Sequence, residues 1–255
     1  IFFNRAFSPA YGTARGVWAT ITGVPDVQQG KTSSRNPAAV NQHTIINDFK
    51  GKEKLYFLGG SSSWANIRGL LTNNIEGLRL YEQGSYKAKE IDVWGISDKN
   101  LFLEANDAMA KETKPFFAEI PKDSLKKYGF ESEDEYNAFR YTDFCFQQFM
   151  EAAKKEKYFD NTLFVFIGDH GIRGDAGTML PNVFTSQGLT NMHVPLLFYA
   201  PKILTPKTYS IPASQIDVLP SIAHLANIGY TNTTLGRNLF SPSANSNSHT
   251  FIFDE

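Results

Sequence analysis

The chain has 255 residues and a net charge of −1, with 42% hydrophobic and 20% charged side chains. It is long enough to bury a sizeable core as one α/β domain, and its balanced charge gives no reason to expect a nucleic-acid partner. The single cysteine, Cys145, excludes an intramolecular disulfide and a cysteine-based metal cluster, and we expect it to be a small buried side chain. No run of about 18 apolar residues is present, so no segment is predicted to span a membrane.

Short apolar runs alternate with helical patterns along the chain. Buried strands are predicted at the opening residues 1–4 and at 54–58, 115–120, 163–167 and 193–199. Helices are predicted at 101–111, from a capping start at 132 to about 157, and at 215–225. The alternation predicts an α/β fold with a central, mostly parallel sheet flanked by helices and a small C-terminal subdomain from about 205 onward. Ligands of such sheets lie at the carboxyl ends of the strands.

The clearest chemical motif is FIGDHG at 166–171, in which a strand ends in Asp169 and His170 between two glycines. A carboxylate oxygen beside an imidazole nitrogen suits zinc, manganese or a related divalent ion. The glycines permit a sharp turn and the close approach of a ligand. The alternative is a turn in which the Asp-His pair is incidental.

A second motif is SPAYGTARGVWAT at 8–20, where a loop with Pro and Gly leads into a helical pattern. Thr13 is predicted near the N-terminus of that helix, where backbone N–H groups favour a phosphoryl oxygen. Its hydroxyl would be a nucleophile if a metal helped to deprotonate it. The alternative is that Thr13 only caps the helix.

Two further motifs carry polar side chains at strand ends. The loop GGSSSWANIRG at 59–69 delivers Trp64, Asn66 and Arg68, and the guanidinium of Arg68 is suited to fork onto phosphate oxygens. His193 begins the strand of NMHVPLLFYAP at 191–201, where a lone histidine is more often structural than catalytic. A surface position is the alternative for Arg68.

Taken in order, these four motifs resemble the lipoteichoic acid synthase-like branch of the sulfatase family, within the alkaline phosphatase superfamily. Further matches are DVWGISD at 92–98, PFF at 115–117, IDVLP at 216–220 and LGRNLF at 235–240. The resemblance covers nearly the whole chain. It implies one sulfatase-like catalytic domain over 1–255 with a three-layer α/β fold.

The resemblance also implies a two-step displacement through a phospho-threonine, in which a phosphoglycerol- or phosphoethanolamine-type head group passes from a phospholipid or glycan substrate to an acceptor. Thr13 matches the nucleophile, and Thr13, Asp169 and His170 match the ligands of one divalent ion (Mn, Zn or Mg). Arg68 and His193 match phosphate-binding residues, and Trp64 and Asn66 lie in the matching loop. Relatives of this kind place the domain outside the cell membrane, after N-terminal spans.

The sequence departs from the family pattern in two places. An early strand with an acidic metal ligand would lie upstream of residue 1, and a histidine-containing loop is missing where the chain runs directly from Phe117 to Asp123. We expect both segments, together with the membrane spans, to belong to a longer protein. If they are truly absent, the metal site is incomplete and the chain is an inactive binding domain.

A hydrolase of the same superfamily is the other alternative. A formylglycine-type sulfatase needs a cysteine or serine followed by x-Pro-x-Arg. Cys145 is followed by FQQF, and Ser8 is followed directly by Pro9, so neither fits. A phosphodiesterase or phosphomonoesterase remains open, because water can replace the acceptor alcohol.

Overall fold

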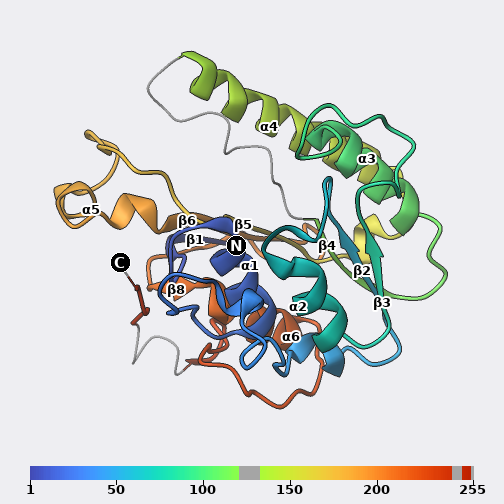
Figure 1. Ribbon diagram of the computed structural model, residues 1–255, viewed down its shortest axis with the longest axis horizontal. Helices are drawn as coiled ribbons and strands as arrows, with labels where there is room; N and C mark the ends of the chain where they lie inside the picture. Colours follow the sequence, from blue (N-terminus) through green and yellow to red (C-terminus); the bar gives the residue numbers. More distant parts are fainter. Residues whose placement is uncertain (121–132, 243–248, 254–255) are drawn as a thin grey trace. The chain divides into compact units, whose positions relative to one another are not determined.

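The computed structural model describes residues 1–120, 133–242 and 249–253. Its contacts divide the chain into two compact units (Figure 1). Unit 1 comprises Ile1–Phe49, Ala65–Ile75 and Leu163–Glu255, and unit 2 comprises Lys50–Trp64 and Glu76–Thr162. Each unit is built on a sheet of its own.

The sheet of unit 1 is five-stranded and mixed. Its strands are β1 (Phe2–Phe7), β5 (Phe164–Ile167), β6 (His193–Tyr199), β7 (Thr208–Tyr209) and β8 (Ala213–Ser214). They follow the order β5-β6-β1-β7, and β8 also pairs with β1. Strand β6 runs antiparallel to β1 and β5, whereas β7 and β8 run parallel to β1. The α/β class is confirmed, but this sheet is mixed where a mostly parallel one was expected.

The direction of β6 follows from the route of the chain between β5 and β6. Ile167 ends β5 opposite Leu196, and the Gly168 N–H donates to the Pro195 carbonyl at 3.2 Å. The chain therefore leaves β5 and returns to the same edge of the sheet, so that β6 must run back along it. An apolar run in a sequence carries no signal for this reversal.

Helices cover the sheet of unit 1, and α1 and α6 lie on the same side of it in Figure 1. The α-helices are α1 (Thr13–Thr22), α2 (Ile67–Asn74), α5 (Asn182–Ser186) and α6 (Val218–Leu225). The short 3-10 turns are η1 (Ser33–Arg35), η2 (Ile45–Asp48), η6 (Leu189–Asn191) and η7 (Gln215–Asp217), and η3 (Trp64–Asn66) crosses the boundary of the two units. Val218 of α6 packs with Phe3, Leu196 and Phe198 of the sheet in one core.

The C-terminal part of the chain belongs to unit 1. Strand β8 pairs with β1, and the buried Leu239 joins the same core as Phe3. The division of the chain into units therefore does not separate residues from about 205 onward as a smaller subdomain.

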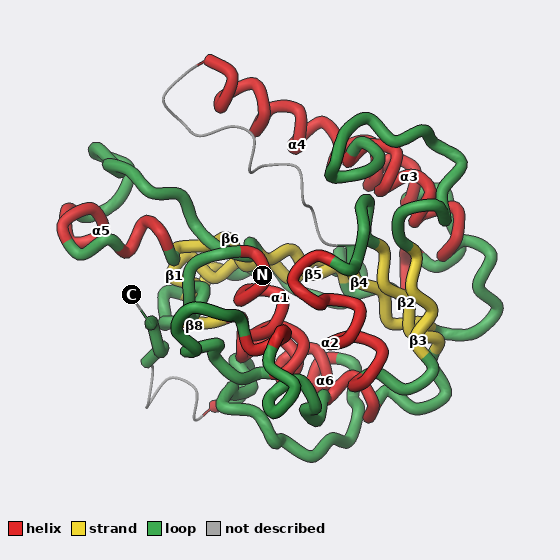
Figure 2. Tube along the Cα trace, in the orientation of Figure 1, coloured by secondary structure: helices red, strands yellow, loops and turns green. Residues whose placement is uncertain are grey.

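Unit 2 has a parallel three-stranded sheet in the order β3-β2-β4, as Figure 2 shows in yellow. Its strands are β2 (Glu53–Phe57), β3 (Leu78–Tyr81) and β4 (Phe116–Glu119), and its helices are α3 (Asp98–Met109), α4 (Glu133–Ala153) and the short η5 (Phe159–Asn161). Helices α3 and α4 pack through Phe102, Phe146 and Phe149. Cys145 of α4 is buried, as predicted. The capping start predicted at Ser132 lies outside the described residues.

Across the three described ranges, no helix combines the length and the apolar character that crossing a bilayer requires.

Candidate active site

Three segments that carry polar motifs meet at one edge of the unit 1 sheet. Phe7, the last residue of β1, pairs with His193, the first residue of β6. Just beyond the strands, the Ser8 N–H donates to the Met192 carbonyl at 2.7 Å and the Gly171 N–H donates to the Asn191 carbonyl at 2.8 Å. The loop before Thr13 and the Asp-His turn therefore both emerge beside the start of β6.

Thr13 is the first residue of α1 and does not cap the helix. Gly12 is the N-cap residue, with φ 105°, and no side chain caps this helix end. Thr13 is only 7% exposed, and its hydroxyl makes no hydrogen bond to a residue that the structure describes. The capping interpretation of Thr13 is therefore wrong, and the hydroxyl has no structural partner in the described part of the chain.

The first turn of α1 packs directly on the backbone of the Asp-His turn. A Cβ added at Gly16 would lie 2.3 Å from the Asp169 carbonyl oxygen, so only glycine permits this approach. Thr13 precedes Gly16 by three residues and lies on the same face of the helix. This packing is consistent with Thr13 lying near Asp169, which stays a prediction.

The two polar side chains of the turn face one another. The His170 Nε2 lies 3.6 Å from an Asp169 carboxylate oxygen, and the side chains are 18% and 38% exposed. The His170 Nδ1 lies 2.7 Å from the Gly171 carbonyl, which can only accept a hydrogen bond. In the neutral ring the proton is therefore on Nδ1, and the Nε2 lone pair points towards a carboxylate. This tautomer is the one that a metal-binding histidine usually adopts.

Tyr11 and Arg173 complete this edge of the site. The Tyr11 ring lies 4.7 Å from the His170 ring, and the Arg173 guanidinium lies 4.7 Å from the centre of the Tyr11 ring. The stack limits the orientations open to the imidazole and brings a positive charge close to it. Sequence reasoning missed both residues, because stacking between loops has no signature in the sequence.

Gln215, at the start of η7, was also missed. It is fully buried, and its Nε2 donates to the Gly168 carbonyl at 2.7 Å and to the Asp169 carbonyl at 2.6 Å. Its Oε1 accepts a hydrogen bond from the Ser8 hydroxyl at 3.2 Å. One amide therefore contacts both the Asp-His turn and the loop before Thr13. The sequence points to Gln215 only through its position directly before the IDVLP motif at 216–220.

Asn66 and Arg68 lie at the start of α2, which packs against α1 and η1. Ala65 and Asn66 have positive φ angles of 51° and 57°, a conformation that is unfavourable for residues other than glycine. Ser34 stabilises it, since its hydroxyl donates to the Ala65 carbonyl and its carbonyl accepts from the Asn66 amide, both at 2.6 Å. Such strain is common at functional sites. Arg68 is exposed.

Trp64 falls in unit 2 by the division of the chain, whereas Asn66 and Arg68 fall in unit 1. The role predicted for Trp64 therefore stays a prediction.

His193 makes contacts within unit 1. Its Nε2 lies 3.0 Å from the Asn4 carbonyl of β1, and its ring packs against the rings of Phe7 and Phe184 at 5.5 and 5.2 Å. The phosphate-binding role predicted for His193 stays a prediction.

The donors at this edge fit a divalent ion in their chemistry. Thr13, Asp169 and His170 offer a hydroxyl, a carboxylate and an imidazole, which are ligand types that divalent ions accept. Within the described ranges, no group of three or more His, Cys, Asp or Glu side chains is placed to hold a metal.

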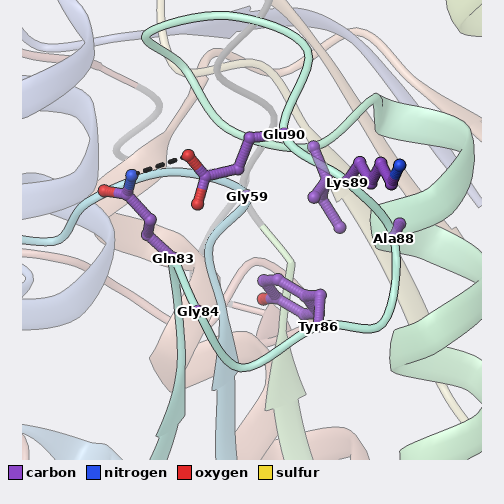
Figure 3. A pocket seen from close by; sticks show the side chains of 8 residues that line it. Gly59, Gln83, Gly84, Tyr86, Ala88, Lys89 and Glu90 are labelled. Atoms are coloured by element: carbon purple, nitrogen blue, oxygen red, sulfur yellow. Dashed lines mark hydrogen bonds between the residues drawn. The ribbon is translucent and has the colours of Figure 1, made fainter.

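A separate cavity of about 240 Å³ lies in unit 2, at the carboxyl ends of β2 and β3. Gln83 donates a hydrogen bond to Glu90 at 2.9 Å, drawn as a dashed line in Figure 3. The hydroxyl of Tyr86, which lies below this pair in the view, is within hydrogen-bonding distance of the Leu58 and Tyr81 carbonyls. The lining residues include Gly59 and Lys89 but none of the residues predicted for chemistry.

The comparisons agree with the geometry of unit 1. A family model described as Sulfatase matches residues 131–228, which include the Asp-His turn, the start of β6 and Gln215. The lipoteichoic acid synthase LtaP from Listeria monocytogenes has a similar structure, with a TM-score of 0.79 over 94% of this chain and 66% of that chain at 16% identity. A Vibrio parahaemolyticus protein in the alkaline phosphatase superfamily gives a TM-score of 0.75 over 94% and 61% of the two chains, at 24% identity.

The chain has the fold of the alkaline phosphatase superfamily. Its sequence resembles the lipoteichoic acid synthase-like branch of the sulfatase family, as predicted. Lipoteichoic acid synthase 1 of Bacillus subtilis (strain 168) is 26% identical over 251 residues, which cover 87% of this chain and 38% of that relative. This sulfatase-like chain therefore spans less than half the length of the curated relative that it matches.

Proposed function

We propose that the chain is the catalytic part of a metal-dependent phosphotransferase that moves a phosphoglycerol- or phosphoethanolamine-type head group through a phospho-threonine at Thr13. The observation that supports the proposal is the packing of Gly16 against the Asp169 carbonyl, in the same helix that begins with Thr13, whose hydroxyl makes no hydrogen bond within the described residues. The resemblance to lipoteichoic acid synthases supports the choice of head group.

In the first step the Thr13 oxygen forms a bond to phosphorus, the bond from phosphorus to the alcohol of the donor breaks, and the donor alcohol leaves with a proton. In the second step an acceptor hydroxyl attacks the same phosphorus, releases Thr13 and loses its own proton. Thr13, Asp169 and His170 would hold a divalent ion, which when bound would lower the pKa of the threonine hydroxyl and neutralise charge on the phosphoryl group. Arg68 forks onto the non-bridging oxygens, with Asn66 and Trp64 lining the loop.

Hydrolysis is the second candidate, favoured by the sulfatase family model over 131–228. The same two steps give a phosphodiesterase when water replaces the acceptor. The incomplete set of ligands in the described ranges also suits an inactive binding domain if the whole protein has no further acidic ligand. By analogy with the lipoteichoic acid synthases that the chain resembles, we propose that the intact protein is bound to the cell membrane and that this domain lies outside it. We also propose that residues 1–255 form one catalytic domain.

The deciding experiment replaces Thr13. Thr13→Ala should abolish turnover of a generic phosphodiester in the intact protein while the fold survives, and Thr13→Ser should retain measurable activity because it keeps the oxygen. Thr22→Ala is the matched control, since Thr22 is buried in the same helix and its hydroxyl donates to the Trp18 carbonyl at 2.8 Å and accepts from the Val24 N–H at 3.2 Å.

Mass spectrometry after an acid quench should find phosphate on Thr13 in the wild type. Full activity of Thr13→Ala, with metal still bound, would refute the covalent route.

A further inference from the structure

We infer that Gln215 is the positioning residue of the active site, which sets the distance between the Thr13 helix and the Asp169–His170 turn. The inference rests on the proposed function, because it concerns the same site. Gln215 touches neither substrate nor metal ligand side chains. It acts through the backbone of the segments that carry them.

The hydrogen bonds of Gln215 reach both halves of the site. Its Nε2 donates to the carbonyls of Gly168 and Asp169. Its Oε1 lies 3.2 Å from the Ser8 hydroxyl, which shares its one proton between Gln215 and the Ala10 carbonyl at 2.5 Å. Because Gln215 is fully buried, losing a partner would leave an unsatisfied polar group without access to water. The amide therefore holds both segments at hydrogen-bonding distance from one point.

The Asp169 carbonyl is confined from two directions. Gly16 of α1 approaches it within the space that a side chain would need, and the Gln215 amide donates to it. A rotation of the Asp169 peptide would break the Gln215 hydrogen bond or clash with Gly16. The backbone that carries the Asp169 carboxylate is thus fixed relative to the helix that begins with Thr13.

Gln215 is itself held by its neighbours in η7. The Ser214 N–H, in the residue before it, donates to the Asp217 carboxylate at 2.9 Å. Asp217 also accepts from the Arg237 N–H at 2.8 Å. This support is what a residue needs in order to position others, because a mobile amide would transmit no constraint.

Unit 1 offers a close control in Asn74. Its buried amide donates to the carbonyls of Val40 and Leu70 at 2.8 and 2.7 Å and accepts from the Gln42 N–H at 2.7 Å. Gln215→Glu and Asn74→Asp therefore make the same chemical change, from an amide with two donated bonds and one accepted bond to a carboxylate that faces two carbonyls. Only the first change is at the proposed site.

The test measures three quantities in the intact protein for both variants, and also for Gln215→Asn. Hydrogen exchange followed without metal should show faster exchange of the Ser8, Gly168 and Gly171 amides in Gln215→Glu and unchanged exchange there in Asn74→Asp. Titration with Mn²⁺ alone, followed by electron paramagnetic resonance, should show binding weakened at least about tenfold in Gln215→Glu, the range seen for residues that support metal ligands. Turnover should fall through kcat, with KM nearly unchanged.

Gln215→Asn retains both donor and acceptor groups on a shorter side chain and should recover part of the Mn²⁺ affinity. The inference is overturned if both amide variants change exchange at these amides equally, or if Gln215→Glu binds Mn²⁺ as the wild type does. A wild type that binds no Mn²⁺, with the local exchange effect present, refutes the proposed function instead and reduces Gln215 to a structural cross-link.

Discussion

Gly12 and Gly16 position Thr13 from either side. Gly12 turns the chain with φ 105°, in the region that glycine adopts readily, and Gly16 lets the helix approach the Asp169 carbonyl. Thr13 itself contributes no cap. At the scale of single residues, the site is therefore defined as much by absent side chains as by polar ones.

Arg68 provides a test at this scale. Arg68→Ala should lower kcat/KM for a phosphodiester at least about a hundredfold if the guanidinium stabilises transition-state charge, and Arg68→Lys should not restore it, because lysine lacks the planar fork. Arg5→Ala is the control, since Arg5 is an exposed arginine of β1 whose contact is the Ser210 carbonyl at 3.4 Å. Unchanged kinetics in Arg68→Ala would remove Arg68 from the site.

At the scale of elements, α1 and the Asp-His turn behave as one packed joint. In the interior of a helix, replacing glycine with alanine normally stabilises the helix by about 1 kcal/mol. At Gly16 the added methyl would lie 2.3 Å from the Asp169 carbonyl oxygen, so the backbone must move apart.

We therefore expect Gly16→Ala to destabilise the protein and weaken Mn²⁺ binding, measured by urea unfolding and metal titration. The control is Gly229→Ala, because a Cβ at Gly229 meets nothing within 4 Å. Wild-type Mn²⁺ affinity in Gly16→Ala would mean that the joint is not needed for the metal site.

Strand β4 ends in an acidic residue whose ionisation opposes folding. Burial raises the pKa of Glu119 from 4.5 to about 7. Between these values the native state holds a proton that the unfolded chain has released, so the free energy of unfolding should fall as pH rises through this window. Glu119→Gln should flatten the pH dependence between about pH 4.5 and 7 in denaturant titrations. An equal slope in the variant would show that Glu119 ionises normally.

The positions of the strands could be predicted from the sequence better than their relative directions in the sheet. Apolar runs located β2, β4, β5 and β6 almost to the residue, because burial on both faces leaves a continuous hydrophobic signature. The short strands β7 and β8 and the turn of the chain that makes β6 antiparallel depend on pairing, which such runs do not encode.

The site shows the same limit. Thr13, Asp169 and His170 could be proposed from the sequence because their chemistry is tied to strand and helix ends, whereas Gln215 contacts backbone carbonyls that are distant in sequence. A buried glutamine has no local pattern that separates it from other polar helix residues. His193 was predicted at a strand start, but its Asn4 and phenylalanine contacts required the fold.

At the scale of the whole molecule, binding of a metal ion should increase the free energy of unfolding. A ligand that binds only the native state at 100 times its dissociation constant adds about 2.7 kcal/mol to the free energy of unfolding. Mn²⁺ should therefore raise the melting temperature of the wild type, and chelation should reverse the rise. Asp169→Asn should lose the effect, and a metal response equal to that of the wild type would place the ion elsewhere.

The segment that connects β5 to β6 has its two ends held together, because the Gly168 and Gly171 N–H groups donate to the Pro195 and Asn191 carbonyls. Closure entropy changes little with length, at about 0.6 kcal/mol for each doubling. This connecting segment should therefore accept a reporter peptide inserted near Met179, which is 85% exposed, without displacement of the Asp-His turn. The protein thus offers a labelling point close to the candidate site, from which a fluorophore could report the binding of a ligand there.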